Sequence, residues 1–336
     1  MRRLPVYLLL DCSESMIGEP LKAVQEGVRS LLKTLMRNPY ALETVWLSVI
    51  TFDAKARVTT PLTELASFSP PALSVKPGTA MGSALELLQT TIERDLKKGT
   101  AESKGDFKPL VFILTDGQPT DNWQRVSKNL LKSKSKIAYI YTIGCGEEVD
   151  FKTMGSISDA CIHLKDLSPE AMSKIFVWLS ASISSSSAQV NEGPVDLTKS
   201  PLGNDLELVD LTKPPAFVSQ KWLFFHVICQ TTKKYFLARF SLDQKSGMYF
   251  PNGAFNLPDD FFSEGSIPAP QVDVNKLIST VQCPFCGNKS FCHCDACDTI
   301  NCFNHKSKAK TITCAKCGEV GYLITDSDFT IGGSAG

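Results

Sequence analysis

Short apolar runs alternate with longer amphipathic stretches through residues 4–188, and this alternation restricts the fold more than any other feature of the chain. The segments 19–38 and 82–98 carry apolar residues at helical spacing, and 168–183 predicts a closing helix with Ser168 as its N-cap. Strands that alternate with helices predict an α/β fold with a doubly wound, mostly parallel sheet. The runs expected to form its strands are 5–11, 44–52, 110–117, 137–144 and 161–166.

Composition changes after residue 188, where serine, glycine and proline become frequent. The pentapeptide VDLTK occurs there twice, at 195–199 and 209–213, either as two similar extended pieces or as a repeated docking motif. We predict five regions in order along the chain: an α/β domain (1–188), a linker (189–219), a small β unit (220–275), a β-rich zinc-binding module (276–325) and a flexible tail (326–336).

Overall charge gives no reason to expect a nucleic acid or a membrane as partner, because 35 basic and 35 acidic residues cancel. The apolar run near the start is far shorter than the about 20 residues that a membrane span needs. We therefore expect a cytoplasmic protein. The scattered Cys12, Cys145, Cys161 and Cys229 lie in apolar segments and are interpreted as small buried hydrophobic residues.

Acid and hydroxyl side chains follow two of the predicted strands and precede one predicted helix. Asp11 ends the first predicted strand with Ser13 and Ser15 just beyond it, and Asp116 lies at the end of the strand predicted at 110–117. Thr79 lies between glycines just before the helix at 82–98. Loops at the carboxyl ends of parallel strands meet where the strand order reverses, so these oxygens are expected to converge. Capping of a helix near Glu19 and shaping of a turn are the structural alternatives.

Such an oxygen set suits a hard divalent cation, Mg²⁺ or else Mn²⁺ or Ca²⁺. Serine and threonine hydroxyls are neutral, so an ion held largely by them still attracts an acidic oxygen from outside. The three segments DCSESM, PGTAMGSAL and LTDGQPTD resemble the metal-ion-dependent adhesion site of von Willebrand factor type A domains. This resemblance implies that Asp11, Ser13, Ser15, Thr79 and Asp116 bind the metal and that an Asp or Glu of a protein partner completes its coordination.

A catalytic function for the same oxygens is the main alternative. A metal-dependent phosphoesterase generally needs two metals about 4 Å apart and more carboxylates. Neither metal-binding loop offers a histidine or a further pair of acids, so we expect a non-enzymatic binding protein. A nucleic-acid-binding zinc protein is the other alternative, although the cysteine-rich segment holds only three phenylalanines and no arginine.

Eight cysteines crowd into residues 283–317 and predict one or two zinc ions. Two Cys-x-x-Cys-Gly turns, with Cys283, Cys286, Cys314 and Cys317, are expected to close the first site. Cys294, Cys297, Cys302 and His305 are expected to form a second, nested site. The spacing equally allows a crossed arrangement, in which Cys283 and Cys286 pair with Cys302 and His305, and Cys294 and Cys297 pair with Cys314 and Cys317. Cys292 and His293 are spare ligands in either arrangement.

The adhesion-site motifs followed by paired cysteine turns resemble the TerY family, which is associated with bacterial tellurite resistance and stress response. The resemblance implies a scaffold that works with a protein kinase and a metal-dependent Ser/Thr phosphatase. The cysteine run between the outer turns is richer than a simple two-turn pattern, so the number of zinc ions stays open.

Overall fold

The structure is a computed structural model that separates the chain into two compact units, Met1–Ser74 with Gly78–Val218 and Val75–Pro77 with Ser219–Gly336. His305 and the first VDLTK copy lie outside the described residues, as does most of the predicted linker. The residues described are 2–100, 104–116, 119–126, 137–146, 149–165, 168–188, 206–213, 222–243, 245–258, 261–262, 271–304, 311–322, 330–332 and 334–335.

The first unit is built on a seven-stranded sheet with the order β3-β2-β1-β4-β5-β6-β7. The five predicted strands form its parallel centre, which confirms the predicted α/β fold. Antiparallel edge strands, β3 and β7, were not predicted. The strands are β1 (Leu4–Asp11), β2 (Val45–Phe52), β3 (Ala56–Glu64), β4 (Leu110–Thr115), β5 (Tyr139–Cys145), β6 (Ala160–Leu164) and β7 (Leu206–Leu208).

Helices cover both faces of this sheet. Successive residues of β4 point to opposite faces, so Phe112 contacts Trp178 of α6 while Val111 and Ile113 join the core under α3 and α5. Ser168 caps α6 as predicted, since its Oγ accepts the N–H of Ala171. The helical segments are η1 (Glu14–Met16), α1 (Glu19–Met36), α2 (Pro39–Thr44), η2 (Leu65–Ser67), α3 (Met81–Asp95), α5 (Phe151–Ile157) and α6 (Pro169–Ala188).

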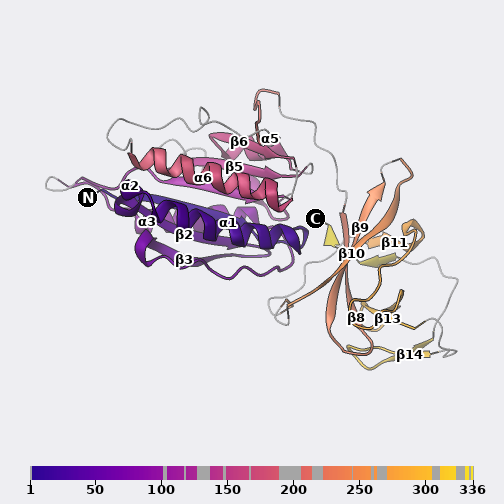
Figure 1. Cartoon of the computed structure of the whole chain (residues 1–336). Helices are drawn as coiled ribbons and strands as arrows, with labels where there is room; N and C mark the ends of the chain where they lie inside the picture. The colour runs from indigo at the N-terminus through magenta and orange to yellow at the C-terminus, as the bar shows by residue number, and fades with distance from the viewer. Residues whose placement is uncertain are drawn as a thin grey trace. The chain divides into compact units, whose positions relative to one another are not determined.

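Helices α1 and α6 lie side by side (Figure 1). Gly27 of α1 makes this close approach possible, because a Cβ at that position would lie 2.0 Å from the ring of Phe176. No helix in the described parts of the chain combines the length and the apolar character that crossing a membrane requires.

The second unit is a β structure whose main sheet has the order β10-β9-β8-β13-β12, with β17 also paired to β8. The β8–β9 hairpin lies in the segment predicted as a small β unit, 220–275. Strand β13 of the cysteine-rich segment pairs in parallel with β8, so both segments share one sheet. These strands are β8 (Trp222–Cys229), β9 (Tyr235–Asp243), β10 (Met248–Asn256), β12 (Ser290–Cys294), β13 (Thr299–Phe303) and β17 (Ser334–Ala335).

Two smaller strand pairs complete the second unit. Strand β11 (Gln271–Asp273) pairs with β16 (Thr330–Gly332) and is followed by η4 (Val274–Lys276). Strand β14 (Thr311–Thr313) pairs with β15 (Val320–Tyr322), and the turn between them carries the last two cysteines. The core of this unit combines phenylalanines of β8 and β9 with cysteines, which places Cys229, Cys283 and Cys302 inside the apolar interior.

Candidate metal centres

The first candidate centre lies at the carboxyl end of β1, next to β4, where the order of the sheet reverses. The Asp11 carboxylate accepts the Ser13 N–H at 2.9 Å and the Thr115 hydroxyl at 2.6 Å. Ser13 Oγ and Ser15 Oγ are 3.0 Å apart, and Ser15 Oγ donates to Asp116 at 2.8 Å. Hydrogen bonds therefore connect four of the five residues predicted to bind a metal.

Thr79 joins this cluster through its loop. Its N–H donates to Thr120 Oγ1 at 3.0 Å, and its carbonyl accepts the Thr120 N–H at 2.9 Å. Thr120 follows Asp116 in the same loop, so these two bonds fix the Thr79 loop beside the Asp116 loop. Thr79 is buried, as are the two aspartates and both serines.

Asp121 fixes the start of α3, a role that the sequence did not reveal. Its carboxylate accepts the N–H groups of Gly82 and Ser83, both at 2.9 Å. A Cβ at Gly82 would lie 2.9 Å from the Asp121 carboxylate, so glycine is needed for this approach. Asp121 thereby links the loop after Asp116 to the helix that follows Thr79.

A third buried acid, Asp53, lies near the cluster, and its negative charge adds to the cost of ionising Asp11. Arg57 compensates Asp53 through an ion pair of 2.7 Å. The Asp53 carbonyl accepts the N–H of Ala80, which ties the end of β2 to the Thr79 loop. Asp53 is thus paired with Arg57 and holds the Thr79 loop in place without belonging to the cluster.

Burial raises the pKa of Asp11 from its ordinary 3.8 to about 6, although hydrogen bonds from Ser13 and Thr115 oppose the shift. Both of those donors are neutral. A divalent cation beside the carboxylate would compensate the buried charge, and this supports the fit of Mg²⁺ to the cluster.

Helix capping, the structural alternative for Asp11 and the serines, does not occur at α1. The N-cap of α1 is Gly18, with φ of 92° and no side-chain cap. The serines instead bond to each other and to Asp116, which lies far away in the sequence.

The second and third candidate centres are two groups of four cysteines, and they differ from the expected pairing. The outer turns at Cys283 and Cys314 do not share a site. The first group, here called the buried group, is Cys229, Cys283, Cys286 and Cys302; the second, called the exposed group, is Cys294, Cys297, Cys314 and Cys317. The exposed group is the one that the crossed arrangement anticipated. Within each group all four sulfur atoms lie within 4.8 Å of one another.

The sulfur spacing suits a tetrahedral zinc ion. Zinc–sulfur bonds of about 2.3 Å imply sulfur atoms about 3.8 Å apart. The Cys286 and Cys302 Sγ atoms are 3.5 Å apart, and the pairs Cys294–Cys317 and Cys297–Cys314 are each 3.7 Å apart. Four thiolates at this spacing are the donor set that structural zinc sites use.

Cys229 is the ligand candidate that the sequence interpretation missed, because it ends an apolar strand and was taken as a small hydrophobic residue. Cys12, Cys145 and Cys161, interpreted in the same way, are buried and belong to neither cysteine group. The parallel pairing of β8 with β13 places Cys229 opposite Cys302. His305, expected in that place, lies outside the described residues.

A local signal for Cys229 exists in its turn. Four turns begin at a cysteine whose carbonyl accepts the N–H of the fifth residue, at 2.8–3.1 Å. That fifth residue has positive φ in every case, which glycine adopts most easily. The turns are Cys229–Lys233, Cys283–Gly287, Cys294–Asp298 and Cys314–Gly318. In the first of them Thr232 stands where the other three have their second cysteine.

These turns direct N–H groups at the sulfur atoms. Burial opposes ionisation of Cys229, but hydrogen bonds from Thr232 outweigh it and lower its pKa to about 6. Burial likewise opposes ionisation of Cys314, whose pKa falls to about 6 through the N–H groups of Cys317 and Lys316. Both turns therefore favour the thiolate, which is the form that binds a metal.

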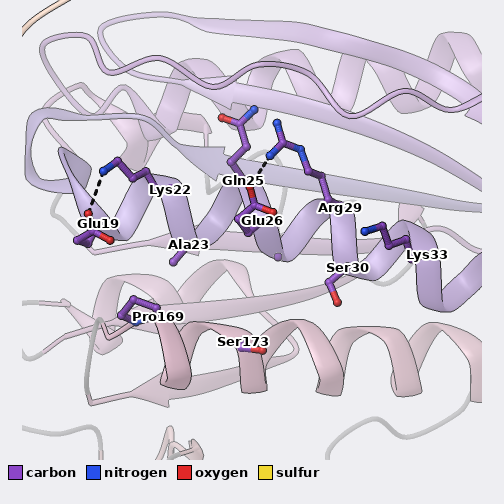
Figure 2. Close-up of a pocket in the computed structure, with 11 residues that line it drawn as sticks. Glu19, Lys22, Ala23, Gln25, Glu26, Arg29, Ser30, Lys33, Pro169 and Ser173 are labelled. Carbon is purple, nitrogen blue, oxygen red and sulfur yellow. Dashed lines mark hydrogen bonds and ion pairs between the residues drawn. The ribbon is translucent and has the colours of Figure 1, made fainter.

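A hollow of about 720 Å³ lies between α1 and α6, and none of the candidate metal ligands lines it (Figure 2). Small residues such as Gly27 and Ser173 contribute to its lining. Figure 2 shows two ion pairs along α1, Glu19 with Lys22 and Glu26 with Arg29, and these exposed pairs add little to stability.

Comparison with known proteins identifies the von Willebrand factor type A domain over residues 6–172. An uncharacterized protein of Synechocystis is 31% identical over 157 residues, which are 44% of this chain and 33% of that protein. A von Willebrand factor A domain-containing protein of Dictyostelium discoideum is 27% identical over 155 residues, 46% of this chain and 16% of that protein. The chain thus spans a third or less of these relatives.

Two matches among solved structures cover just over half of this chain. A von Willebrand factor type A protein from Catenulispora acidiphila is 19% identical with a TM-score of 0.41, covering 55% of this chain and 43% of its own. Proximal thread matrix protein 1 from the mussel byssus, described with a zinc-occupied MIDAS motif, is 16% identical with a TM-score of 0.41 and covers 54% of this chain and 48% of its own.

Proposed function

Residues 6–172 form a von Willebrand factor type A domain, and we propose that this domain is the partner-binding part of a non-enzymatic, cytoplasmic adaptor. The observation that carries the proposal is the hydrogen-bonded cluster of Asp11, Ser13, Ser15 and Asp116 at the switch point of the sheet, with Thr79 on the adjoining loop. The five residues supply two carboxylates and three hydroxyls.

Mg²⁺ is the metal that we propose for this cluster. The two carboxylates balance the charge of a divalent cation, while the hydroxyls add oxygen atoms without charge. Such an ion retains attraction for one more anionic oxygen, so a carboxylate from a protein partner is the proposed last ligand. Asp53 does not compete for that place, because Arg57 holds it.

Zinc is the metal that we propose for the buried and exposed groups, one ion in each. Two sites of four thiolates would be structural, since each is closed by protein ligands. The second unit would then offer a surface stabilised by zinc, in addition to the partner-binding domain.

The resemblance to the TerY family suggests which partners to test. A protein kinase and a metal-dependent Ser/Thr phosphatase from the source organism are the proposed candidates, and a stress-response complex is the proposed setting.

A capture experiment with the full chain tests the adaptor function. The immobilised chain is incubated with the purified kinase or phosphatase in Mg²⁺ or in excess EDTA, and the bound protein is quantified. We expect capture in Mg²⁺ alone, and its loss in Asp11→Ala and Thr79→Ala. Glu43→Gln, an exposed acid on α2, is the matched control that keeps binding. Equal capture in EDTA, or by the Asp11 variant, would contradict the proposal.

A further inference from the structure

We propose that the amide side chains of Gln230 and Asn301 couple the two cysteine groups, so that the exposed group can bind zinc only on a β8–β13 pair fastened by the buried group. The inference rests on the two zinc ions of the proposed function. It assigns Gln230 and Asn301 as positioning residues, which contact the ligands and the turn that carries them.

The two amides lie beside ligands of the buried group. Gln230 follows Cys229 at the end of β8, and Asn301 precedes Cys302 on β13. Neighbouring strand residues point to opposite faces, so Cys302 enters the buried group while Asn301 faces the other way. The Gln230 amide donates to Asn301 Oδ1 at 3.0 Å, which joins β8 and β13 a second time.

Asn301 also contacts the exposed group directly. Its Oδ1 accepts the Ala315 N–H at 2.8 Å, and its Nδ2 donates to Cys314 Sγ at 3.5 Å. Nδ2 makes a further bond to the Thr299 carbonyl at 3.1 Å. Asn301 is only 1% exposed, so water cannot replace these bonds easily.

Gln230 holds the same turn from the other side. Its Nε2 donates to the carbonyl of Thr313, at 2.9 Å, immediately before Cys314. The two amides therefore position the β14–β15 turn, which brings Cys314 and Cys317 to the exposed group. The position of that turn therefore depends on the pairing of β8 with β13, which holds both amides.

The coupling factor is the same in both directions, but the two groups differ in burial, so losing zinc from one disturbs more of the structure than losing it from the other. Cys229, Cys283 and Cys302 are at most 1% exposed and belong to the core of the second unit. Cys317 is exposed, while Cys294 and Cys297 are partly so. Loss of zinc from the exposed group would release the β14–β15 turn, whereas loss from the buried group would separate β8 from β13 and displace both amides.

Groups that hydrogen-bond to metal ligands typically change metal affinity by about 10–100-fold when they are removed. We expect an effect of that size at the exposed group when Asn301 is replaced. By linkage, zinc at the buried group raises zinc affinity at the exposed group, and the reverse holds by the same factor.

The test follows zinc release from the zinc-loaded full chain. A chromophoric chelator reports release in time, and elemental analysis gives the number of ions bound. Cys317→Ser and Cys283→Ser assign the kinetic phases to the exposed and buried groups. For the wild type we expect two bound ions, one released fast and one slowly. Cys317→Ser should lose the fast phase only, while Cys283→Ser should lose both.

Asn301→Ala should accelerate the fast phase about 10–100-fold and leave the slow phase nearly unchanged. Asn301→Asp, which keeps the acceptor but removes the donor to Cys314, should act in the same direction. Gln230→Ala, at a partly exposed position, gives a second variant should the Asn301 variants fold poorly. Asn252→Ala on β10 is the matched control, because it removes an amide side chain that accepts a hydrogen bond from Arg239 of β9.

Hydrogen exchange supplies a readout that is independent of the chelator, with faster exchange expected at 311–322 in Asn301→Ala. If the wild type binds two ions but Asn301→Ala releases zinc at the same rates as the Asn252→Ala control, the coupling alone is overturned. An exposed group that still binds zinc in Cys283→Ser would overturn it as well. A wild-type chain without tightly bound zinc would overturn the zinc sites of the proposed function and the coupling with them.

Discussion

The Asp11 carboxylate accepts hydrogen bonds from the Ser13 N–H and the Thr115 hydroxyl. Asp11 also precedes the loop that carries Ser13 and Ser15. Replacing Asp11 with Asn keeps the shape of the side chain and removes one of the two negative charges of the proposed Mg²⁺ site. We expect Mg²⁺ affinity to fall at least tenfold, about 1.4 kcal/mol. Titration calorimetry on the full chain measures this, with Glu43→Gln as control, and an unchanged dissociation constant would exclude Asp11 as a ligand.

The titration of Asp11 predicts how Mg²⁺ binding depends on pH. Because burial raises its pKa to about 6, protons compete with Mg²⁺ below that value, and affinity should fall by about tenfold for each further pH unit.

In the metal-free protein the raised pKa of Asp11 disfavours the charged form, so stability should decrease as pH rises from about 4 to about 6. Melting curves near pH 5 and pH 7.5 check this. Mg²⁺ should raise the melting temperature more at the higher pH, and an equal rise at both would contradict the prediction.

At the scale of residues, the convergence of the oxygen side chains was predictable where they share one local motif. Asp11, Ser13 and Ser15 lie within five positions and follow an apolar run, so their convergence follows from strand direction. Cys229 has no cysteine near it in the sequence, and its role depends on a pairing with β13 that no local pattern encodes. The shared turn geometry of Cys229–Lys233 was the one local clue.

The contact between α1 and α6 depends on a missing side chain. Gly27→Ala would place a Cβ against the Phe176 ring, and we expect a net loss of about 1–2 kcal/mol in the free energy of unfolding despite the better helix propensity of alanine. Ser30→Ala, at an exposed position of the same helix, should change stability by less than about 0.5 kcal/mol.

Urea unfolding of both single variants and of Gly27→Ala/Phe176→Leu measures the effect. The double variant should lose less than the sum of its single losses, because the smaller side chain relieves the contact. Strict additivity would show that Gly27 and Phe176 do not interact.

The β8–β9 turn resembles the three cysteine turns with a threonine in the fourth position. Cys302→Ser should empty the buried group, since three thiolates remain. Adding Thr232→Cys restores the Cys-x-x-Cys spacing and should recover tetrathiolate binding in part. Cobalt absorption in the single and double variants measures the recovery, with Thr231→Cys beside it as a control that should not rescue. Failure of the double variant to bind cobalt would show that Thr232 does not occupy a ligand position.

Among the elements, the central strands and long helices were predictable because each carries its own hydrophobic pattern. Strand β3 was missed since it is an edge strand whose residues are all partly or fully exposed, and it has a proline at position 61. Strand β7 was missed because it is short and lies within the segment interpreted as a linker.

At the scale of the molecule, the two units have separate cores and should respond differently to metal removal. A strong zinc chelator should increase hydrogen exchange in β8, β9 and β13 while β1, β4 and β5 stay protected, because both four-cysteine groups belong to the second unit. A second sample receives EDTA followed by excess Mg²⁺, so that only zinc stays removed, and this separates the effect of Mg²⁺ from that of zinc. Increased exchange in the central strands of the first unit would contradict their independence.

The predicted α/β fold was confirmed because alternation extends over a whole domain, and many weak local signals agree. The predicted grouping of the cysteines was wrong in part, because their spacing along the chain shows which pairs are possible but not which strands lie next to each other. The TerY resemblance, with its kinase and phosphatase, stays a prediction.

The parallel pairing of β8 with β13 has a consequence for folding. Parallel neighbours cannot be joined by a tight hairpin, and here β9, β10 and two cysteine turns separate the paired segments along the chain. Closing so long a loop costs entropy before any contact compensates for it. A zinc ion bridging Cys229 to Cys302 would cross-link the unfolded chain at that point, much as a disulfide does, and the supply of zinc would then set how fast the second unit folds.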